Sequence, residues 1–169
     1  METNSELNLN ESGNLKLPPH SLEAEESALG SMMLSKEAIT SSIEILKIED
    51  FYQDAHRKIY DAILNIYNRN EPADVITIAE ELKKTDSLEE VGGITYLADL
   101  SSNVTAVSNI KSYCNIIKEK GILRELIDAS DKIISASYSP DAKADLIIEL
   151  AEKSVFDITQ DSTKNGLVN

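Results

Sequence analysis

Apolar side chains recur every three or four residues along most of the chain, which is the spacing of one face of an α-helix. Ser21, Ser35 and Asp74 stand directly before three such stretches, where N-cap residues are favoured. Pro72 and the Gly92-Gly93 pair interrupt the pattern, because proline cannot continue a helix and glycine readily forms turns. The pattern predicts helices over residues 21–34, 36–46, 54–69, 75–84 and 95–100. We therefore predict a globular helical subdomain over residues 21–106, preceded by a flexible N-terminal arm over residues 1–20.

Two longer helices follow this subdomain. The pattern predicts one from about Val107 to Tyr138 and another from about Ala142 to Ile158, joined by the turn Ser139-Pro140-Asp141. Helices with so short a connection lie antiparallel. We therefore expect an all-α fold, in which the globular subdomain precedes a long antiparallel hairpin over residues 107–160. Residues 161–169 are polar and contain glycine, which is typical of the start of a linker.

Both hairpin helices are apolar on more than one face. A single partner helix covers one stripe only, so the remaining apolar surface needs another partner. Two hairpins that pair form a four-helix bundle, and we infer that the partner is a second copy of the chain. The candidates for this dimer interface are Leu123, Leu126, Ile134, Leu146, Leu150 and Phe156.

Charge and composition narrow the function further. The chain has 169 residues, 41% of them hydrophobic, and a net charge of −14. Residues 1–107 carry 8 Lys and Arg against 20 Asp and Glu, whereas residues 108–160 carry 7 against 9. A near-neutral hairpin suits association, and the acidic remainder would repel a nucleic acid. No apolar run is long enough to span a membrane and the polar start is no signal peptide, so we expect a cytoplasmic protein.

The sequence offers no catalytic, cofactor or metal site that we would defend. No spaced glycines followed by Lys and Ser or Thr form a phosphate-binding loop. His56 could act as a base with Asp54, but a locally hydrogen-bonded histidine at a helix start is the favoured interpretation. The carboxylates Glu23, Glu25 and Glu26 are interpreted as a solvated face or as partners of the helix dipole. The single cysteine, Cys114, lies in an apolar stripe and is expected in the core.

The order of these pieces resembles the N-terminal domain of the bacterial replicative DNA helicase, the DnaB family. Any one of the matching segments is weak, but their succession in order over about 140 residues is specific. The segments are Leu17-Pro18-Pro19-His20, Glu23-Ala24-Glu25, Leu29-Gly30, Asp50-Phe51-Tyr52, Ala55-His56-Arg57, Ile59-Tyr60, Glu71-Pro72, Asp74-Val75, Leu88-Glu89-Glu90-Val91-Gly92-Gly93, Tyr96-Leu97, Asn109-Ile110 and Tyr113.

The resemblance implies a domain in which hairpins pair between subunits and six copies form a collar as three dimers. It implies that the collar receives the C-terminal helicase-binding domain of primase, and that in some members a helicase loader touches the same side of the ring. It also implies a ring of ATPase domains that uses ATP and Mg²⁺ and moves along DNA. We expect that motor to be absent from these residues, and therefore no ATPase or unwinding activity from them. An alternative is a stand-alone structural or regulatory dimerisation protein of the same fold.

Three positions match those implicated in primase association in the family: Tyr96, Ile127 and Ile133. Ordinary core packing competes with this role for Tyr96, and packing within the dimer competes for the two isoleucines. Gly121 is unusual because glycine inside a helix costs about 1 kcal/mol relative to alanine. It marks either a close approach of another segment or a bend.

Overall fold

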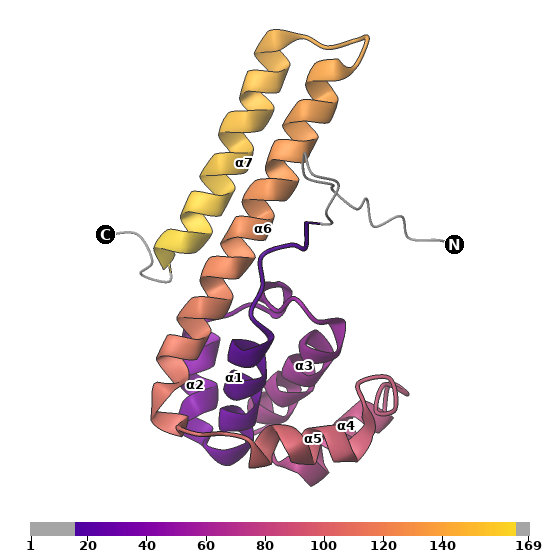
Figure 1. Ribbon diagram of the computed structural model, residues 1–169, viewed down its shortest axis with the longest axis vertical. Helices are drawn as coiled ribbons and strands as arrows, with labels where there is room; N and C mark the ends of the chain where they lie inside the picture. The colour runs from indigo at the N-terminus through magenta and orange to yellow at the C-terminus, as the bar shows by residue number, and fades with distance from the viewer. Residues whose placement is uncertain (1–15, 165–169) are drawn as a thin grey trace.

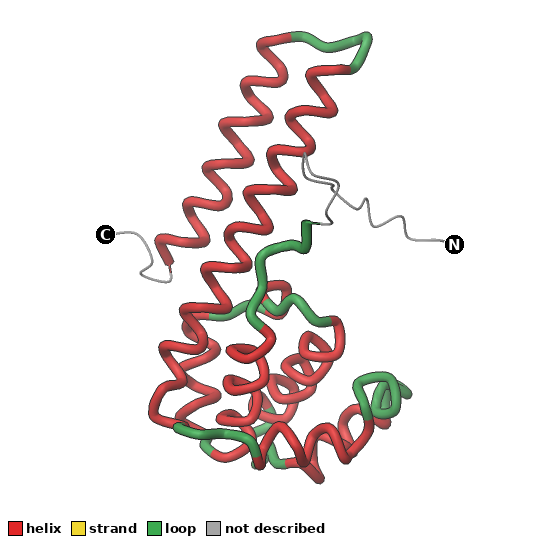
Figure 2. The backbone as a smooth tube through the Cα atoms, in the orientation of Figure 1, coloured by secondary structure: helices red, strands yellow, loops and turns green. Residues whose placement is uncertain are grey.

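The computed structural model describes residues 16–164, which form seven α-helices and two short 3₁₀ helices. The described residues contain no strand, so the expected all-α class is confirmed (Figure 2). Across these residues, every helix is too short or too polar to span a lipid bilayer. The elements are α1 (Leu22–Leu34), α2 (Lys36–Ile45), η1 (Ile48–Asp50), α3 (Asp54–Asn68), α4 (Val75–Lys83), α5 (Gly93–Ser102), η2 (Val107–Asn109), α6 (Ile110–Tyr138) and α7 (Ala144–Lys164).

Local side-chain hydrogen bonds explain where three helices begin. The Ser21 hydroxyl accepts the N–H of Ala24 at 3.3 Å, and the Ser35 hydroxyl accepts the N–H of Ala38 at 3.3 Å. At α4 the Asp74 carboxylate accepts the N–H of Thr77 at 2.8 Å, and the Thr77 hydroxyl accepts the N–H of Asp74 at the same distance. Each bond satisfies a backbone group that the first helical turn leaves without a partner. The three predicted N-caps are confirmed.

The first five helices and the first half of α6 share one hydrophobic core. Leu29, Phe51, Ile63 and Leu97 are completely buried there, and Ile117 of α6 is 1% exposed. Cys114 also lies in this core, as predicted. The core therefore continues past residue 106, and α6 belongs to both the globule and the hairpin. The second half of α6 projects from the globule beside α7 (Figure 1).

The end of the hairpin differs from the prediction. Helix α7 begins at Ala144 and continues to Lys164, so residues 161–164 belong to the helix and not to a linker. The reason is tertiary: the Asp161 carboxylate forms ion pairs with Lys47 and Lys118, which hold this end of α7 on the globule. The rest of the predicted linker, residues 165–169, lies outside the described residues.

The last residues of the predicted flexible arm are fixed by contacts with the globule. Arg124 donates a hydrogen bond to the Pro19 carbonyl at 2.7 Å, and the His20 ring stacks on Tyr52 with the ring centroids 4.1 Å apart. The arm is therefore not flexible at this point, because a cation and an aromatic ring from distant segments hold it. Residues 1–15 lie outside the described residues.

Two glycines allow backbones to approach closely. A Cβ at Gly121 would lie 2.9 Å from the Asp50 Oδ1 atom and 3.3 Å from its Cα. A Cβ at Gly30 would lie 2.2 Å from the Leu100 carbonyl oxygen, where α1 crosses α5. Of the two explanations for Gly121, the structure supports the close approach, because the η1 segment around Asp50 lies directly against it.

Candidate partner-binding surfaces

Apolar side chains form a continuous exposed row along α6. Residues 116, 123, 127, 134 and 138 are separated by seven, four, seven and four positions, which keeps them on one face over about 33 Å of helix. We call this row the α6 stripe. All five side chains are exposed, from 39% for Leu123 to 87% for Tyr138. The near-heptad spacing is that of a helix that packs lengthwise against a partner helix. The members of the α6 stripe are Ile116, Leu123, Ile127, Ile134 and Tyr138.

Helix α7 covers a different face of α6. Residues 122, 125, 129, 133 and 136 of α6 are less exposed than the α6 stripe, and they form a row that lies roughly opposite to it. Because α7 is the neighbour of the projecting half of α6 (Figure 1), the row packs against α7. Ile133 therefore lies half-buried inside the hairpin, while Ile127 belongs to the exposed α6 stripe.

The candidate interface residues of α7 do not form a single row. The half-buried positions 147, 151, 154 and 158 face α6, and Leu146 and Leu150 lie on one flank of them. Phe156, 60% exposed, lies on the face opposite to α6. The predicted residues Leu126, Leu146 and Leu150 are also exposed. A single chain thus leaves all six dimer-interface candidates uncovered.

Tyr96 lies on α5, in the globule, whereas Ile127 and Ile133 lie in the projecting half of α6 (Figure 1). The structure therefore does not bring these three candidates together within one chain. Tyr96 is half-buried against Gly92, where a Cβ would lie 2.8 Å from the Tyr96 Cβ and 3.1 Å from its Cγ. Gly92 has φ of +114°, a conformation that other residues rarely adopt. Only glycine fits this turn beneath the tyrosine ring.

A buried polar network connects Tyr96 to the core. The Tyr96 hydroxyl lies 2.6 Å from His56 Nε2, and His56 Nδ1 lies 2.8 Å from the Glu25 carboxylate. Glu25 also accepts the backbone N–H groups of Tyr52 at 2.9 Å and Gln53 at 3.3 Å. Burial, together with the nearby charges of Glu26 and Glu25, raises the pKa of Tyr96 to about 12. We call Glu25, His56 and Tyr96 the Glu25–His56–Tyr96 network.

This network corrects two interpretations of the sequence. Glu25 is 1% exposed, so it is neither a solvated carboxylate nor simply a helix-dipole partner like its neighbours. His56 is 2% exposed, and its partners lie 31 and 40 residues away instead of being local. Helical spacing alone could not reveal this, because Glu23 and Glu26 are exposed and adjacent in sequence.

A second buried charge cluster joins the hairpin to the globule. Lys118 of α6 is completely buried, and its ammonium lies 3.1 Å from Asp50 Oδ2 and 3.0 Å from Asp161 Oδ2. Lys47 lies 2.7 Å from the same Asp161 oxygen and 3.6 Å from Glu125. We call these five residues the junction cluster. Sequence reasoning missed this cluster, since its members come from three separate segments: the η1 segment, α6 and α7.

The carboxylates of the junction cluster could be mistaken for a metal site. Asp50, Glu125 and Asp161 each place one oxygen within 4.8 Å of the others. The two ammonium groups of Lys47 and Lys118 already supply positive charge between these oxygens. The geometry is therefore that of an ion-pair network that ties α6, α7 and η1 together.

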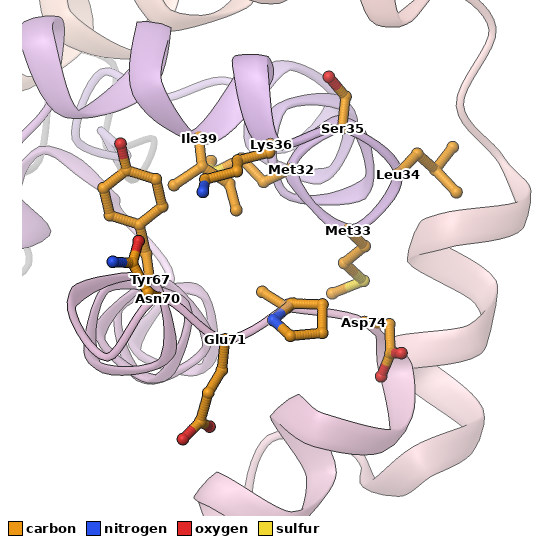
Figure 3. Close-up of a pocket in the computed structure, with 12 residues that line it drawn as sticks. Met32, Met33, Leu34, Ser35, Lys36, Ile39, Tyr67, Asn70, Glu71 and Asp74 are labelled. Atoms are coloured by element: carbon orange, nitrogen blue, oxygen red, sulfur yellow. The ribbon is translucent and has the colours of Figure 1, made fainter.

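A cavity of about 370 Å³ lies where α1, α2 and α3 meet the α3–α4 connection (Figure 3). Met32, Met33 and Ile39 give it an apolar lining. Figure 3 shows the Met33 side chain pointing toward the α3–α4 connection and the Glu71 carboxylate pointing away from the opening. Such a lining suits an apolar side chain, but nothing in it identifies one ligand.

Comparison with known proteins relates these features to one family. A family model of the DnaB-like helicase N-terminal domain matches residues 17–119. The replicative DNA helicase DnaC of Bacillus subtilis is 39% identical over 156 residues, which are 92% of this chain and 34% of that protein. The replicative DNA helicase DnaB of Mycobacterium leprae is 40% identical over 145 residues, 85% of this chain and 24% of that protein. The chain thus spans a quarter to a third of the length of these curated relatives.

Two solved structures share the fold. The N-terminal domain of DnaB helicase from Mycobacterium tuberculosis matches with a TM-score of 0.77 and 40% identity, covering 83% of this chain and 99% of that one. A DnaB-like replicative helicase described with its interactions with primase matches with a TM-score of 0.69 and 25% identity. That match covers 83% of this chain and 31% of the helicase.

Proposed function

The chain belongs to the DnaB-like helicase N-terminal domain family, and on that basis we propose that it is the collar domain of a hexameric replicative DNA helicase. In this proposal the hairpin pairs with that of a second subunit, three dimers form the collar, and the collar docks primase and a helicase loader. ATP and Mg²⁺ are used by a motor domain outside residues 1–169. These residues themselves carry assembly and docking, and the role places the protein in the cytoplasm.

The exposed α6 stripe is the main support for self-association. A monomeric protein rarely leaves a long contiguous apolar row in water, because burying apolar surface contributes about 25 cal/mol per Å². The row lies on the face of α6 away from α7, so a second hairpin can approach without disturbing the first. The dimer-interface candidates Leu123 and Ile134 belong to this row, and its near-heptad spacing suits a helix from another hairpin.

The distribution of charge also supports self-association through the hairpin. The hairpin is nearly neutral, whereas the rest of the chain carries almost all of the net charge of −14. Two copies that meet through neutral hairpins keep their acidic globules on the outside of the contact, which limits repulsion.

Primase docking rests on the relatives and on two surface positions. One structural relative is described with its interactions with primase. Tyr96 and Ile127 present a half-buried aromatic ring and an exposed aliphatic side chain, residue types suited to interfaces. Ile133 packs inside the hairpin, so we propose that it supports the docking surface and dimer from within.

The first test measures molar mass by light scattering against protein concentration for the wild type, Ile127→Asp and the matched control Ile76→Asp. Ile76 is a strongly exposed apolar residue of α4, away from the hairpin. We expect the wild type and Ile76→Asp to dimerise, and Ile127→Asp to dimerise at least tenfold more weakly, a change of about 1.4 kcal/mol. A wild type that stays monomeric at high concentration would contradict the proposal.

The second test measures binding of the cognate primase C-terminal domain to the same three proteins. No binding by the wild type at tens of micromolar, which corresponds to a weak complex, would contradict primase docking. An Ile127→Asp protein that is monomeric and no longer binds shows that docking depends on the dimer. An Ile127→Asp protein that dimerises but no longer binds shows direct contact.

A further inference from the structure

Tyr96 is held more firmly than a half-buried surface residue requires. Its ring rests on the Gly92 backbone, and its hydroxyl is bonded to His56 at 2.6 Å. The Tyr96 and His56 rings are nearly parallel, with an angle of 7° and centroids 6.1 Å apart. Contacts at both the base and the tip of the side chain restrict both of its rotatable torsions.

The support behind Tyr96 is itself fixed. His56 is bonded to Glu25, and Glu25 is bonded to two backbone N–H groups at the start of α3. A carboxylate only accepts hydrogen bonds, so Nδ1 of His56 donates to Glu25, while Nε2 on the other side of the ring is hydrogen-bonded to the Tyr96 hydroxyl. The hydrogen bonds therefore link Tyr96 on α5 through His56 on α3 to Glu25 on α1.

Fold stability alone does not account for this arrangement. Burying a carboxylate and an imidazole carries a desolvation cost, and apolar residues of similar size often stabilise a core as well or better. The network ends at the one member that reaches the surface, Tyr96. A side chain that is ordered before binding loses less conformational entropy when a partner docks.

We infer that Glu25 and His56 are positioning residues that hold the Tyr96 ring in the orientation in which a protein partner binds it. This inference rests on the proposed docking role, in which the partner is the C-terminal domain of primase. The partner contacts the ring of Tyr96, and its affinity depends on two residues that it never touches.

The experiment compares primase-domain binding by the full 169-residue chain with that of His56→Gln, Tyr96→Phe, Tyr96→Ala and the double variant His56→Gln/Tyr96→Ala. We expect His56→Gln and Tyr96→Phe each to weaken binding by roughly two- to tenfold, the range given by ordering one side chain. In the Tyr96→Ala background, His56→Gln should have no further effect, because it acts through Tyr96. The matched control is Tyr67→Phe, which removes the hydroxyl of another half-buried tyrosine, bonded to Thr40; it should bind like the wild type.

A second readout does not need the partner. In the wild type, NMR should show strong contacts between the Tyr96 ring protons and the α protons of Gly92, and these should weaken in Tyr96→Phe and His56→Gln. Tyr96→Phe keeps the buried Glu25–His56 pair, so it tests the inference even if His56→Gln does not fold. Additive effects in the double variant, or a ring that stays ordered without its hydroxyl bond, would overturn the inference. If the wild type does not bind primase while the ring loses its order as expected, primase docking fails and positioning of Tyr96 by the network stands.

Discussion

Replacement of Lys118 by methionine tests the charge cluster that joins the hairpin to the globule. Methionine has a similar length but no charge, so the change removes two ion pairs, at 3.1 Å to Asp50 and 3.0 Å to Asp161. Asp161 keeps its contact with Lys47 at 2.7 Å and is partly exposed. Asp50 is 2% exposed, and it still accepts a hydrogen bond from the backbone N–H of Lys47 at 2.8 Å. The variant therefore leaves the buried Asp50 carboxylate without its ion pair to Lys118.

The expected loss of unfolding free energy is about 3–5 kcal/mol, the usual cost of breaking a buried ion pair from one side. This is a large part of the 5–15 kcal/mol typical of a domain. With a urea dependence of about 2 kcal/mol per M, the unfolding midpoint should fall by roughly 2 M. Adding Asp50→Asn to Lys118→Met removes the uncompensated charge, so the double variant should be more stable than Lys118→Met alone.

The assay is urea unfolding followed by circular dichroism, at one fixed protein concentration because self-association adds to apparent stability. Lys111→Met is the matched control, since Lys111 is an exposed lysine of the same helix, and its effect should stay within about 0.5 kcal/mol. If Lys118→Met is no less stable than Lys111→Met, the junction cluster does not hold the hairpin as described.

Three further predictions concern Gly121, Cys114 and Asp161. Gly121→Ala should destabilise by about 1–3 kcal/mol despite its better helix propensity, because the new Cβ would lie 2.9 Å from the fixed Asp50 carboxylate; a higher urea midpoint would contradict this. Burial raises the pKa of Cys114 to about 11, although the hydrogen bond to Ser42 opposes this shift. At pH 8 the thiolate of Cys114 is therefore about 100-fold scarcer than that of an unshifted thiol. We expect Cys114 to react with a thiol reagent only when the protein unfolds. For Asp161, burial raises the pKa but hydrogen bonds from Lys47 and Lys118 outweigh it and lower the pKa. The contribution of ionised Asp161 to the free energy of unfolding is therefore present above the unfolded pKa of about 4 and is lost as the pH falls further. The difference in unfolding free energy between the wild type and Asp161→Asn should be constant from pH 5 to 7 and shrink below pH 4. A difference that grows in acid would contradict this sign.

The sequence and the structure agree where the deciding forces are local. The caps at Ser21, Ser35 and Asp74 bond to a residue three positions away, so their residue types and spacing were enough to predict them. Pro140 and the apolar periodicity likewise predicted two antiparallel helices, and the surplus of apolar positions predicted the exposed surface of the hairpin. These features need no knowledge of distant segments.

Tertiary structure alone decided which charged residues are buried. In the sequence, Glu25 cannot be told apart from its exposed neighbours. In the structure, the start of α3 places His56 and two backbone N–H groups within hydrogen-bond distance of its carboxylate. Lys118 lies in a polar stretch of α6, and Asp161 lies in a stretch whose composition is typical of a linker. The two residues are 43 positions apart in the sequence, yet their side chains are hydrogen-bonded to each other. The physical reason is the cost of desolvation. A charged side chain is buried only where an opposite charge and hydrogen-bond partners lie close to it, and the packing of the helices determines which residues these partners are.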